Sequence, residues 1–306
     1  MRVFVTGGSG FIGSAVVPEL LGAGHEVTGL ARSDASAEAL TAAGAKVLRG
    51  DLEDLDALRK GAAESDGVVH LAFVHAFPDF ATSAAIDARA VAAFGSALEG
   101  SGRPLVIASG VAGFTPGQVA TEQDFPALTL GSPFAPRAAN ARATLDLAEH
   151  AVRSSVVRLP PTVHGEGDHG FIALLVGIAR ERGAAGYVGD GAARWPAVHR
   201  SDAARLFRLA LEQAPAGTVL HGVAEEGVPT RAIAESIGAN LGLPAVPVAP
   251  QDAEGHFGWL GGLYAMDTRA SSTRTRELLG WQPTGPGLLE DLDQGHYFTP
   301  RPAGGH

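Results

Sequence analysis

The sequence predicts an α/β protein built on a doubly wound parallel sheet, and two observations lead to this prediction. Short, almost continuously apolar runs alternate with helical patterns through the first 160 residues. Such runs are typical of strands that are buried on both faces of a parallel sheet. A glycine-rich turn also directly follows the first run. Repeated strand–helix units at this spacing indicate a doubly wound domain, and the more irregular second half indicates a smaller region after it.

Six strands are expected in the first half of the chain, because six short runs there are rich in apolar and β-branched residues. They are Val3–Val5, Val27–Leu30, Lys46–Leu48, Val68–Leu71, Leu105–Ala108 and Val156–Leu159.

The helices expected between these strands follow from apolar spacing and from start and stop signals. Ile12, Val16 and Leu20 fall on one helical face, and this segment ends at Gly22–Gly24. Asp54 is a good N-cap residue and is expected to begin a short helix. Two longer helices are expected over Ala84–Leu98 and Ala138–Val152.

After Leu159 the alternation becomes irregular, beginning at the Pro160-Pro161 break. Helices are expected at Phe171–Arg182, Ser201–Gln213, Arg231–Leu241 and Ser271–Leu279, and strands at Gly186–Val188, Val219–Val223 and Ala245–Val248. Segments 110–136 and 160–170 are rich in Gly and Pro and are long, which is typical of functional or mobile loops.

The composition excludes several classes of protein. Hydrophobic residues make up 45% of the 306 residues, which is enough for a large core and excludes a disordered chain. The net charge of −10 is opposite in sign to that of most proteins that bind nucleic acid, so no nucleic-acid partner is expected. The chain has no cysteine, which excludes disulfides, thiolate metal sites and cysteine nucleophiles.

Membrane, export and metal signals are also missing from the sequence. No apolar run approaches the ~20 residues that a membrane-spanning helix needs, so no membrane partner is expected. The chain turns directly after Met1–Val5 and leaves no room for the apolar part of an export signal, so a cytoplasmic protein is expected. No second histidine stands at ligand spacing from His169, and therefore no metal is expected.

The glycine-rich turn predicts a dinucleotide site. Gly7, Gly10 and Gly13 hold the spacing G-x-x-G-x-x-G between the first strand and the first helix. A backbone without Cβ atoms lets a diphosphate approach closely, and the free N–H groups and dipole at the start of the helix bind its negative charge. Phe11 and Ile12 lie between the last two glycines and are included in the predicted site.

The end of the second strand distinguishes NADP from NAD. An NAD-specific domain normally has an acidic residue here, which binds the ribose 2′-hydroxyl. This chain instead has Arg32 followed by Ser33. A guanidinium group is always charged and fits a 2′-phosphate, so NADP is the expected cofactor. Two alternatives remain: Asp34 supplies the acidic residue and the cofactor is NAD, or Arg32 is simply a solvated side chain in a turn.

Asp51 and Leu52 follow the third strand and are also expected in the cofactor site. A short polar side chain there is suited to bond the adenine amino group. Asp51 equally suits a helix N-cap, and the two roles are compatible.

These patterns divide the chain into three parts. Residues 1–160 are expected to form a dinucleotide-binding domain of the Rossmann type. Residues 161–298 are expected to form mainly a smaller substrate-binding region, with segments that return to the first domain. Residues 299–306 are expected to be a frayed tail.

Seven segments together resemble the extended short-chain dehydrogenase/reductase superfamily, in particular its NAD-dependent epimerase/dehydratase-like members. They are Thr6–Gly13, Asp51–Leu52, His70–Ala72, Leu105–Ser109, Val157–Gly165, Ala197–Ala204 and Glu277–Pro283. Each alone would be weak, but they cover nearly the whole chain. The resemblance implies a Rossmann fold, places Leu71 and Ala72 beside the cofactor, and implies a homodimer formed through the two long helices.

The resemblance also implies a catalytic set of Ser or Thr, Tyr and Lys, and this chain departs from it. The Tyr-x-x-x-Lys pair aligns with Arg137 and Ala141, and the serine position falls on Gly110, with Ser109 adjacent. The three tyrosines of the chain, Tyr187, Tyr264 and Tyr297, all lie far downstream. Arginine is a poor proton donor because it does not deprotonate, although it stabilises negative charge and binds anionic substrates.

Four other side chains are candidates for proton transfer and substrate contact. His75 lies in the loop after the fourth strand, which borders the ligand crevice in doubly wound sheets, and histidine titrates near neutral pH. A loop histidine without a catalytic role is the alternative. His164 stands where the family often has tyrosine and is expected to contact substrate. Phe73 and Trp195 are expected to wall an apolar substrate pocket, although aromatic side chains are more often core.

Two functions of different classes are consistent with these residues. The first is an NADP-dependent oxidoreductase that reduces a small carbonyl or imine-type substrate. In it, His75 or a bound water supplies the proton, while Arg137 orients the substrate and Ser109 contributes to the site. A substrate imine that binds already protonated would need no proton donor. The second function is a non-catalytic NADP(H)-binding sensor or regulatory protein.

Overall fold

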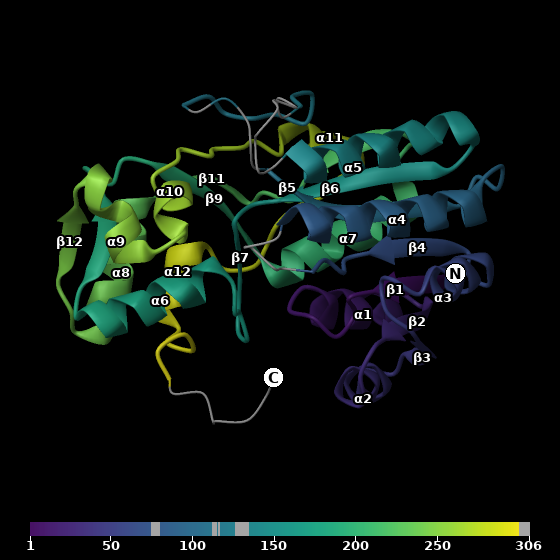
Figure 1. The fold of residues 1–306 in the computed structure, drawn as a ribbon, viewed down its shortest axis with the longest axis horizontal. Coiled ribbons are helices and arrows are strands. Elements are labelled where there is room, and N and C mark those ends of the chain that lie inside the picture. Colours follow the sequence, from purple (N-terminus) through teal and green to yellow (C-terminus); the bar gives the residue numbers. More distant parts are fainter. Residues whose placement is uncertain (75–79, 112–114, 116, 126–134, 300–306) are drawn as a thin grey trace.

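A seven-stranded parallel sheet forms the centre of the larger part of the molecule (Figure 1). The computed structural model describes residues 1–74, 80–111, 115, 117–125 and 135–299. The strands are β1 (Arg2–Thr6), β2 (Glu26–Ala31), β3 (Lys46–Arg49), β4 (Gly67–His70), β5 (Pro104–Gly110), β6 (Arg153–Leu159) and β10 (Thr218–His221), in the order β10-β6-β5-β4-β1-β2-β3. The connections run in opposite directions on the two sides of β1 and β4, and the carboxyl ends of these two strands therefore border the ligand crevice.

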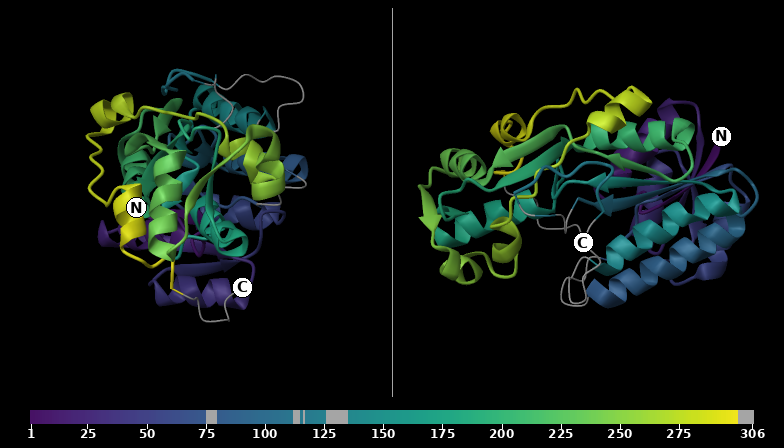
Figure 2. Two further views of the ribbon diagram at one scale, coloured as in Figure 1. Left: turned by 90° about the vertical axis from the view of Figure 1, so that its left-hand side faces the viewer. Right: turned by 90° about the horizontal axis from the view of Figure 1, so that it is seen from above.

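Helices cover both faces of this sheet, on opposite sides in the right-hand view of Figure 2. One face carries α1 (Gly13–Gly22), α2 (Asp34–Ala42), α7 (Arg200–Gln213) and α11 (Thr273–Leu279); the other carries α3 (Leu55–Ala63), α4 (Phe80–Leu98) and α5 (Ala135–Asp146), with the 3-10 helix η2 (Leu147–His150) after it. Val3 and Val5 pack on the first face and Phe4 on the second. The strands are continuously apolar because both of their faces are covered.

A smaller region lies beside the carboxyl ends of the large sheet (Figure 1). It holds a three-stranded sheet ordered β11-β9-β7 and the parallel pair β12-β8. Its elements are β7 (Thr162–His164), α6 (Phe171–Arg182), β8 (Ala185–Val188), β9 (Arg194–His199), β11 (Glu225–Pro229), α8 (Thr230–Leu241), β12 (Ala245–Val248), η3 (Pro250–Asp252), α9 (Ala253–Phe257), α10 (Leu260–Tyr264) and α12 (Leu288–Asp293). Trp195, Phe257 and Tyr264 form the aromatic centre of its core.

The chain passes between the two regions more than once. After β9 it returns to the large sheet through α7 and β10, and β10 pairs with β6 in parallel register from Thr218 opposite Ser155 to His221 opposite Arg158. After α10 it returns again through α11, which packs on α7 and β10. Segments from the second half of the chain therefore complete the sheet of the first half.

The predicted fold class, a doubly wound parallel sheet with a smaller C-terminal region, is confirmed. All six strands expected in the first half are present, and α6 and β12 have the predicted bounds. The helix expected over Ala138–Val152 is divided, because α5 ends at Asp146 and Ala151 takes a left-handed conformation with φ 54° after η2.

Several short elements were not predicted, and each has a physical reason. α2 is rich in Ala and polar residues and buries only Leu40, so it shows no clear apolar stripe. Pro196 lies within the apolar run of β9. Proline is rarely found in a central strand, so this run does not predict a strand. β7 is only three residues long and lies within the segment 160–170 that is expected to be a loop.

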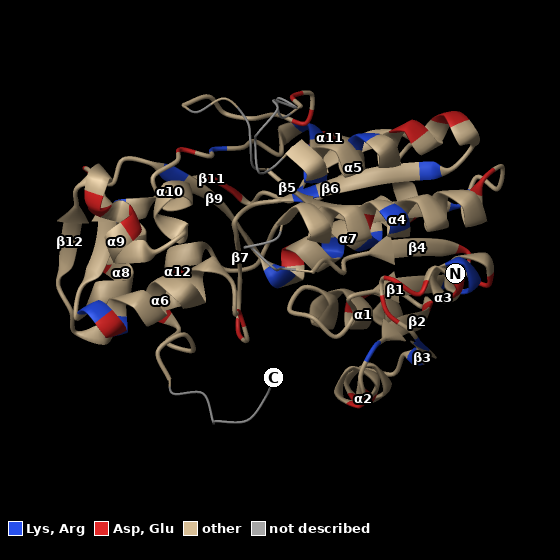
Figure 3. Cartoon of the chain, in the orientation of Figure 1, with Lys and Arg blue, Asp and Glu red and all other residues tan. Residues whose placement is uncertain are grey.

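The charges and the helices add two general features. In Figure 3, acidic and basic residues are interspersed along the elements of both regions. Within the described ranges, none of the helices is both long enough and apolar enough to cross a membrane.

Candidate cofactor and active site

The turn between β1 and α1 is built so tightly that two of its glycines have no room for a side chain. Gly7 has φ +71°, and a Cβ there would lie 2.7 Å from the backbone nitrogen of Ala72. A Cβ on Gly13 would lie 2.0 Å from the carbonyl oxygen of Gly7. These close approaches place the ends of β1 and β4 and the start of α1 around one point.

Backbone donors of this turn are available to an anion. Gly10 N donates to Gly7 O at 3.0 Å and Ser14 N donates to Gly10 O at 2.8 Å. The N–H groups of Phe11 and Ile12, between them, have no acceptor among the described residues. Ile12 is the N-cap of α1 and supplies no side-chain cap. Free donors at a helix N-terminus beside closely packed glycines fit the diphosphate of a dinucleotide.

The three residues on which the choice between NADP and NAD depends lie directly after β2 and have different surroundings. Arg32 is exposed directly after the strand. Ser33 is the N-cap of α2 and forms a capping box with Ser36. The carboxylate of Asp34 forms an ion pair with Arg49, which stands at the end of the neighbouring β3.

The predicted adenine-side residues occupy the turn after β3. Asp51 Oδ1 accepts hydrogen bonds from Glu53 N at 2.8 Å and from Asp54 N at 3.1 Å. Asp54, not Asp51, is the N-cap of α3, because its side chain accepts a bond from Ala57 N at 3.0 Å. Leu52 is partly buried beside them. Adenine contact by Asp51 and Leu52 stays a prediction.

Beneath the glycine turn lies a chain of buried polar side chains. Thr6 Oγ1 is 2.6 Å from His70 Nδ1, and His70 Nε2 is 3.1 Å from Asp87 Oδ1. Ala72 N approaches Thr6 Oγ1 at 3.4 Å, so the hydroxyl is free to donate its own proton to His70. These contacts favour a proton on His70 Nε2 that is donated to Asp87. Asn140 donates to Asp87 Oδ2 at 2.6 Å.

Arg137 completes this network from the start of α5. Its Nη1 lies 2.7 Å from Asp87 Oδ1, its Nη2 donates to the carbonyl of Ala108 at 2.7 Å, and its guanidinium carbon lies 4.0 Å from the centre of the Phe73 ring. Burial lowers the pKa of Arg137, and the charge of Asp87 opposes this shift. Burial alone would raise the pKa of Asp87, but the hydrogen bond from His70 and the charge of Arg137 lower it.

The other predicted catalytic residues have different surroundings. Ser109 is partly buried near the end of β5, next to Ala108, and its hydroxyl has no hydrogen bond to any described residue. His75 lies outside the described residues. Proton transfer by His75, substrate orientation by Arg137 and participation of Ser109 stay predictions.

In the smaller region, His164 is fully buried at the end of β7. Its Nδ1 lies 2.9 Å from Asp291 Oδ2, its Nε2 has no partner among the described residues, and its ring meets that of His199 edge-on at 5.5 Å. Trp195 is also fully buried, with its ring centre 5.1 Å from that of Tyr264 in the core. Contacts of Phe73, His164 and Trp195 with a substrate stay predictions.

A second buried acid lies between His164 and α6. Tyr297 donates to Asp168 Oδ2 at 2.9 Å, and Gly170 N donates to Oδ1 at 2.6 Å. Burial raises the pKa of Asp168 despite these bonds. The described part of the chain contains no cluster of three or more potential metal ligands.

Comparison with known proteins identifies the family of the chain. The model of the NAD dependent epimerase/dehydratase family matches residues 3–221. The chain belongs to this family. The matched range begins in β1 and ends at β10, so it covers the large sheet and the part of the smaller region inserted before β10.

Individual proteins are similar to this chain over most of their length. An uncharacterized protein of Schizosaccharomyces pombe is 47% identical over 299 residues, covering 97% of this chain and 100% of that protein. A 2-alkyl-3-oxoalkanoate reductase of Stenotrophomonas maltophilia is 28% identical over 267 residues, covering 81% and 78%. The structure of the dTDP-glucose 4,6-dehydratase DesIV of Streptomyces venezuelae with NAD and TYD bound aligns with a TM-score of 0.77 and 22% identity, covering 97% of each chain.

Two site residues were not singled out from the sequence. Asp87 is the acid that holds Arg137, and its signal is its spacing: it falls on the buried stripe of α4 between Ala84 and Val91, where an aspartate needs a partner. Arg200, at the start of α7, lies over the Phe11 ring of the glycine turn. No local pattern shows that contact, because it joins segments about 190 residues apart.

Proposed function

We propose that this family member is an NADP-dependent oxidoreductase that reduces a small carbonyl or imine-type substrate without a tyrosine proton donor. The supporting observation is the pairing at the end of β2. Asp34, the acidic residue that would serve the ribose 2′-hydroxyl of NAD, is paired with Arg49, whereas Arg32 is exposed and positioned to meet a 2′-phosphate.

The described residues fit such a cofactor along its length. The free N–H groups of Phe11 and Ile12 would hold the diphosphate, and Arg32 would hold the 2′-phosphate. The carboxyl ends of β4 and β5, with Leu71, Ala72 and Ser109, border the space where the nicotinamide would lie. When bound, NADPH supplies the hydride.

The proposed reduction of a carbonyl also needs a source for the proton. A neutral carbonyl needs one hydride and one proton to become an alcohol, whereas an iminium ion needs only the hydride to become an amine. Arg137 is held by Asp87 and by the carbonyl of Ala108, and an arginine does not release its proton, so it would position groups and stabilise charge only. The hydroxyl of Ser109, which has no partner among the described residues, would hydrogen-bond the substrate.

Calorimetric titration with NADP and NAD tests the cofactor. We expect Arg32→Ala to weaken NADP binding about 10- to 100-fold, the effect of losing a charge-assisted hydrogen bond, and to leave NAD binding unchanged. Arg59→Ala is the matched control, because Arg59 is a half-exposed arginine of α3 that pairs with Asp56. Equal loss for both dinucleotides, or no binding of either by the wild type, would contradict the proposal.

Turnover tests the chemistry. NADPH oxidation would be followed with ketones, cyclic imines and activated alkenes, using Ser109→Ala as the site variant. The arrangement of Arg137 also favours a second function, a non-catalytic sensor of NADP(H), because its guanidinium is already paired with Asp87 and bonded to the carbonyl of Ala108. No turnover of any substrate, together with different affinities for NADP and NADPH, would decide for the sensor.

A further inference from the structure

Arg200 lies where the smaller region meets the glycine turn. It is the first residue of α7 and is partly buried. Its guanidinium carbon lies 5.6 Å from the centre of the Phe11 ring, and His169 meets the same ring edge-on at 5.9 Å. A Cβ on Gly167 would lie 3.8 Å from Arg200 Nη1, so the 165–170 loop passes directly over the guanidinium.

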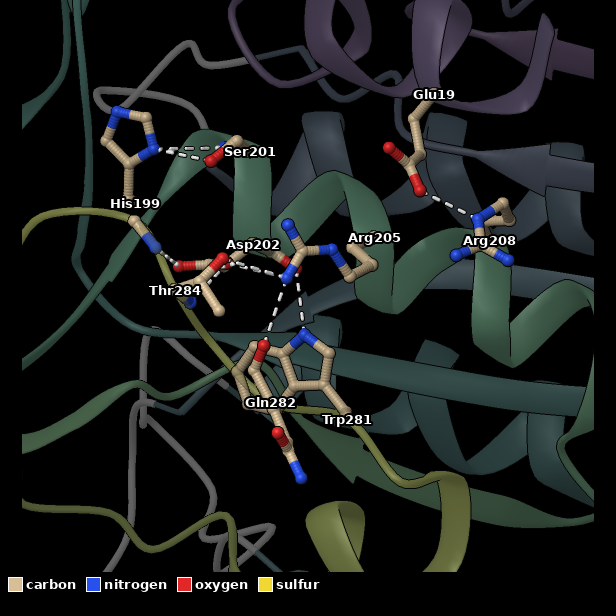
Figure 4. A network of polar contacts seen from close by, with 10 residues as sticks. Glu19, His199, Ser201, Asp202, Arg205, Arg208, Trp281, Gln282 and Thr284 are labelled. Atoms are coloured by element: carbon tan, nitrogen blue, oxygen red, sulfur yellow. Dashed lines mark hydrogen bonds and ion pairs between the residues drawn. The ribbon is translucent and has the colours of Figure 1, made fainter. Parts of the chain in front are cut away.

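Two acids close to Arg200 in the fold, Asp202 in the first turn of α7 and Asp168 in the 165–170 loop, are occupied by other partners. Asp202 accepts hydrogen bonds from Thr284 N at 2.9 Å and Gly285 N at 2.8 Å, and it lies 3.4 Å from Arg205 Nη1 (Figure 4). Asp168 is bound by Tyr297 and the Gly170 N–H.

The remaining titratable neighbours do not neutralise Arg200 either. Asp291 is bound by His164, and the exposed Glu166 forms no ion pair with Arg200. His199 adds no positive charge of its own near neutral pH, because burial and the nearby His164 lower its pKa. Among the described residues, Arg200 has no ion pair and no hydrogen bond through its side chain. A partly buried, unpaired guanidinium is costly unless it meets an anion.

We propose that Arg200 is a cofactor-binding residue that closes the diphosphate site from the side opposite the glycine turn. This inference rests on the proposed function. The backbone N–H of Phe11 would bind the diphosphate, and the ring of Phe11 packs against the Arg200 guanidinium. Both contacts therefore involve the same residue. A guanidinium offers paired N–H donors that match two phosphate oxygens, which a lysine would not reproduce.

Arg200 stands at the junction of the two regions. It follows directly on β9 of the smaller region and begins α7, which packs on the large sheet, and the glycine turn leads into α1 on the same sheet. The bound dinucleotide would therefore lie between the glycine turn and the start of α7.

The test compares ligands with and without the diphosphate. NADP and 2′-AMP would be titrated calorimetrically against the wild type, Arg200→Ala, Arg200→Lys and the control Arg274→Ala, an exposed arginine of α11. We expect Arg200→Ala to weaken NADP binding about 10- to 100-fold and Arg200→Lys to weaken it less. We expect 2′-AMP, which has no diphosphate, to bind all four proteins equally.

The contrary outcomes are distinct. Unchanged NADP affinity in Arg200→Ala overturns the inference, and so does an equal loss for 2′-AMP or a loss confined to the KM of a substrate. If Arg200→Ala fails to fold, the inference is judged on Arg200→Lys, whose NADP affinity must fall while its 2′-AMP affinity does not. Failure of the wild type to bind NADP would instead refute the proposed function itself.

Discussion

Two buried histidine–aspartate pairs, one in each region of the molecule, differ in how completely they are satisfied. Beneath the glycine turn, both ring nitrogens of His70 are bonded, one to Thr6 and one to Asp87. In the smaller region, His164 bonds Asp291 through Nδ1, and its Nε2 has no partner in the part of the chain described. Both ring nitrogens of His70 thus have partners, whereas one ring nitrogen of His164 has none among the described residues.

The two acids also differ in the charged and polar groups around them. Asp87 also holds Arg137 and Asn140, so it joins four elements, β4, α4, α5 and, through Ala108, β5. Asp291 is bonded to His164, and His296 Nε2 lies farther away at 3.6 Å. Removing the first acid would leave the guanidinium of Arg137 without its partner, whereas removing the second would leave His164 Nδ1 without its contact.

Substitution at Asp87 should have the largest effect on stability. We expect Asp87→Ala to lower the free energy of unfolding by about 3–5 kcal/mol, because it leaves the buried charge of Arg137 unpaired. Urea unfolding measures the loss. Asp56→Ala is the control, since the Asp56 side chain is 95% exposed in its pair with Arg59, and it should cost about 0–1 kcal/mol. Similar losses in the two variants would show that the network is not an ion-paired unit.

Substitution at Asp291 should have a smaller effect. We expect Asp291→Ala to cost about 1–3 kcal/mol, the usual result of leaving one buried donor unsatisfied. Asp291→Asn keeps an acceptor for His164 Nδ1 and should cost less. If Asp291→Ala destabilised the protein as much as Asp87→Ala, the proposed difference between the two pairs would be wrong.

The pH dependence of stability should show the smallest of these effects. The contributions of Asp87 and Asp168 to it should be opposite in sign. The pKa of Asp87 is lowered, so its stabilisation is present above the usual aspartate range and is lost as the pH falls through the folded value. Burial raises the pKa of Asp168, so its charge destabilises the fold at neutral pH, and this penalty is relieved as the pH falls through the raised value.

Unfolding free energies of the wild type, Asp87→Asn and Asp168→Asn between pH 7 and acid pH would separate these contributions. Asp87→Asn should lose less stability than the wild type on acidification, and Asp168→Asn should lose more. Parallel curves for all three proteins would mean that neither carboxyl has a shifted pKa.

The sequence was sufficient for the sheet and the glycine turn but not for the network below it. Strands such as β1 are recognisable because both of their faces are buried. Gly7 is needed for its left-handed φ and Gly13 for its close approach to Gly7, and their spacing expresses both requirements directly. The partner of Arg137 lies 50 residues earlier, on α4, and nothing near Arg137 in the sequence points to it. The contact depends on how α4 and α5 pack, which is a tertiary property.

The sequence is also insufficient for elements and residues whose contacts are made by a segment far away in the chain. β9 carries a proline and is recognisable as a strand only when β7 and β11 are seen on its two sides. Arg200 carries no signal in its own neighbourhood, because its importance comes from the Phe11 ring on the other side of the crevice.

The position of α7 has a consequence for how the protein is made. Leu206, Phe207, Ala210 and Leu211 of this helix cover Val106 and Val157 on one face of the large sheet. Glu19 of α1 also binds Arg208 across this interface at 2.7 Å (Figure 4). During synthesis, β4, β5 and β6 emerge from the ribosome before α7, which covers them on this face. For some fifty further residues the nascent chain therefore carries this part of the apolar face uncovered, a state that is prone to aggregation.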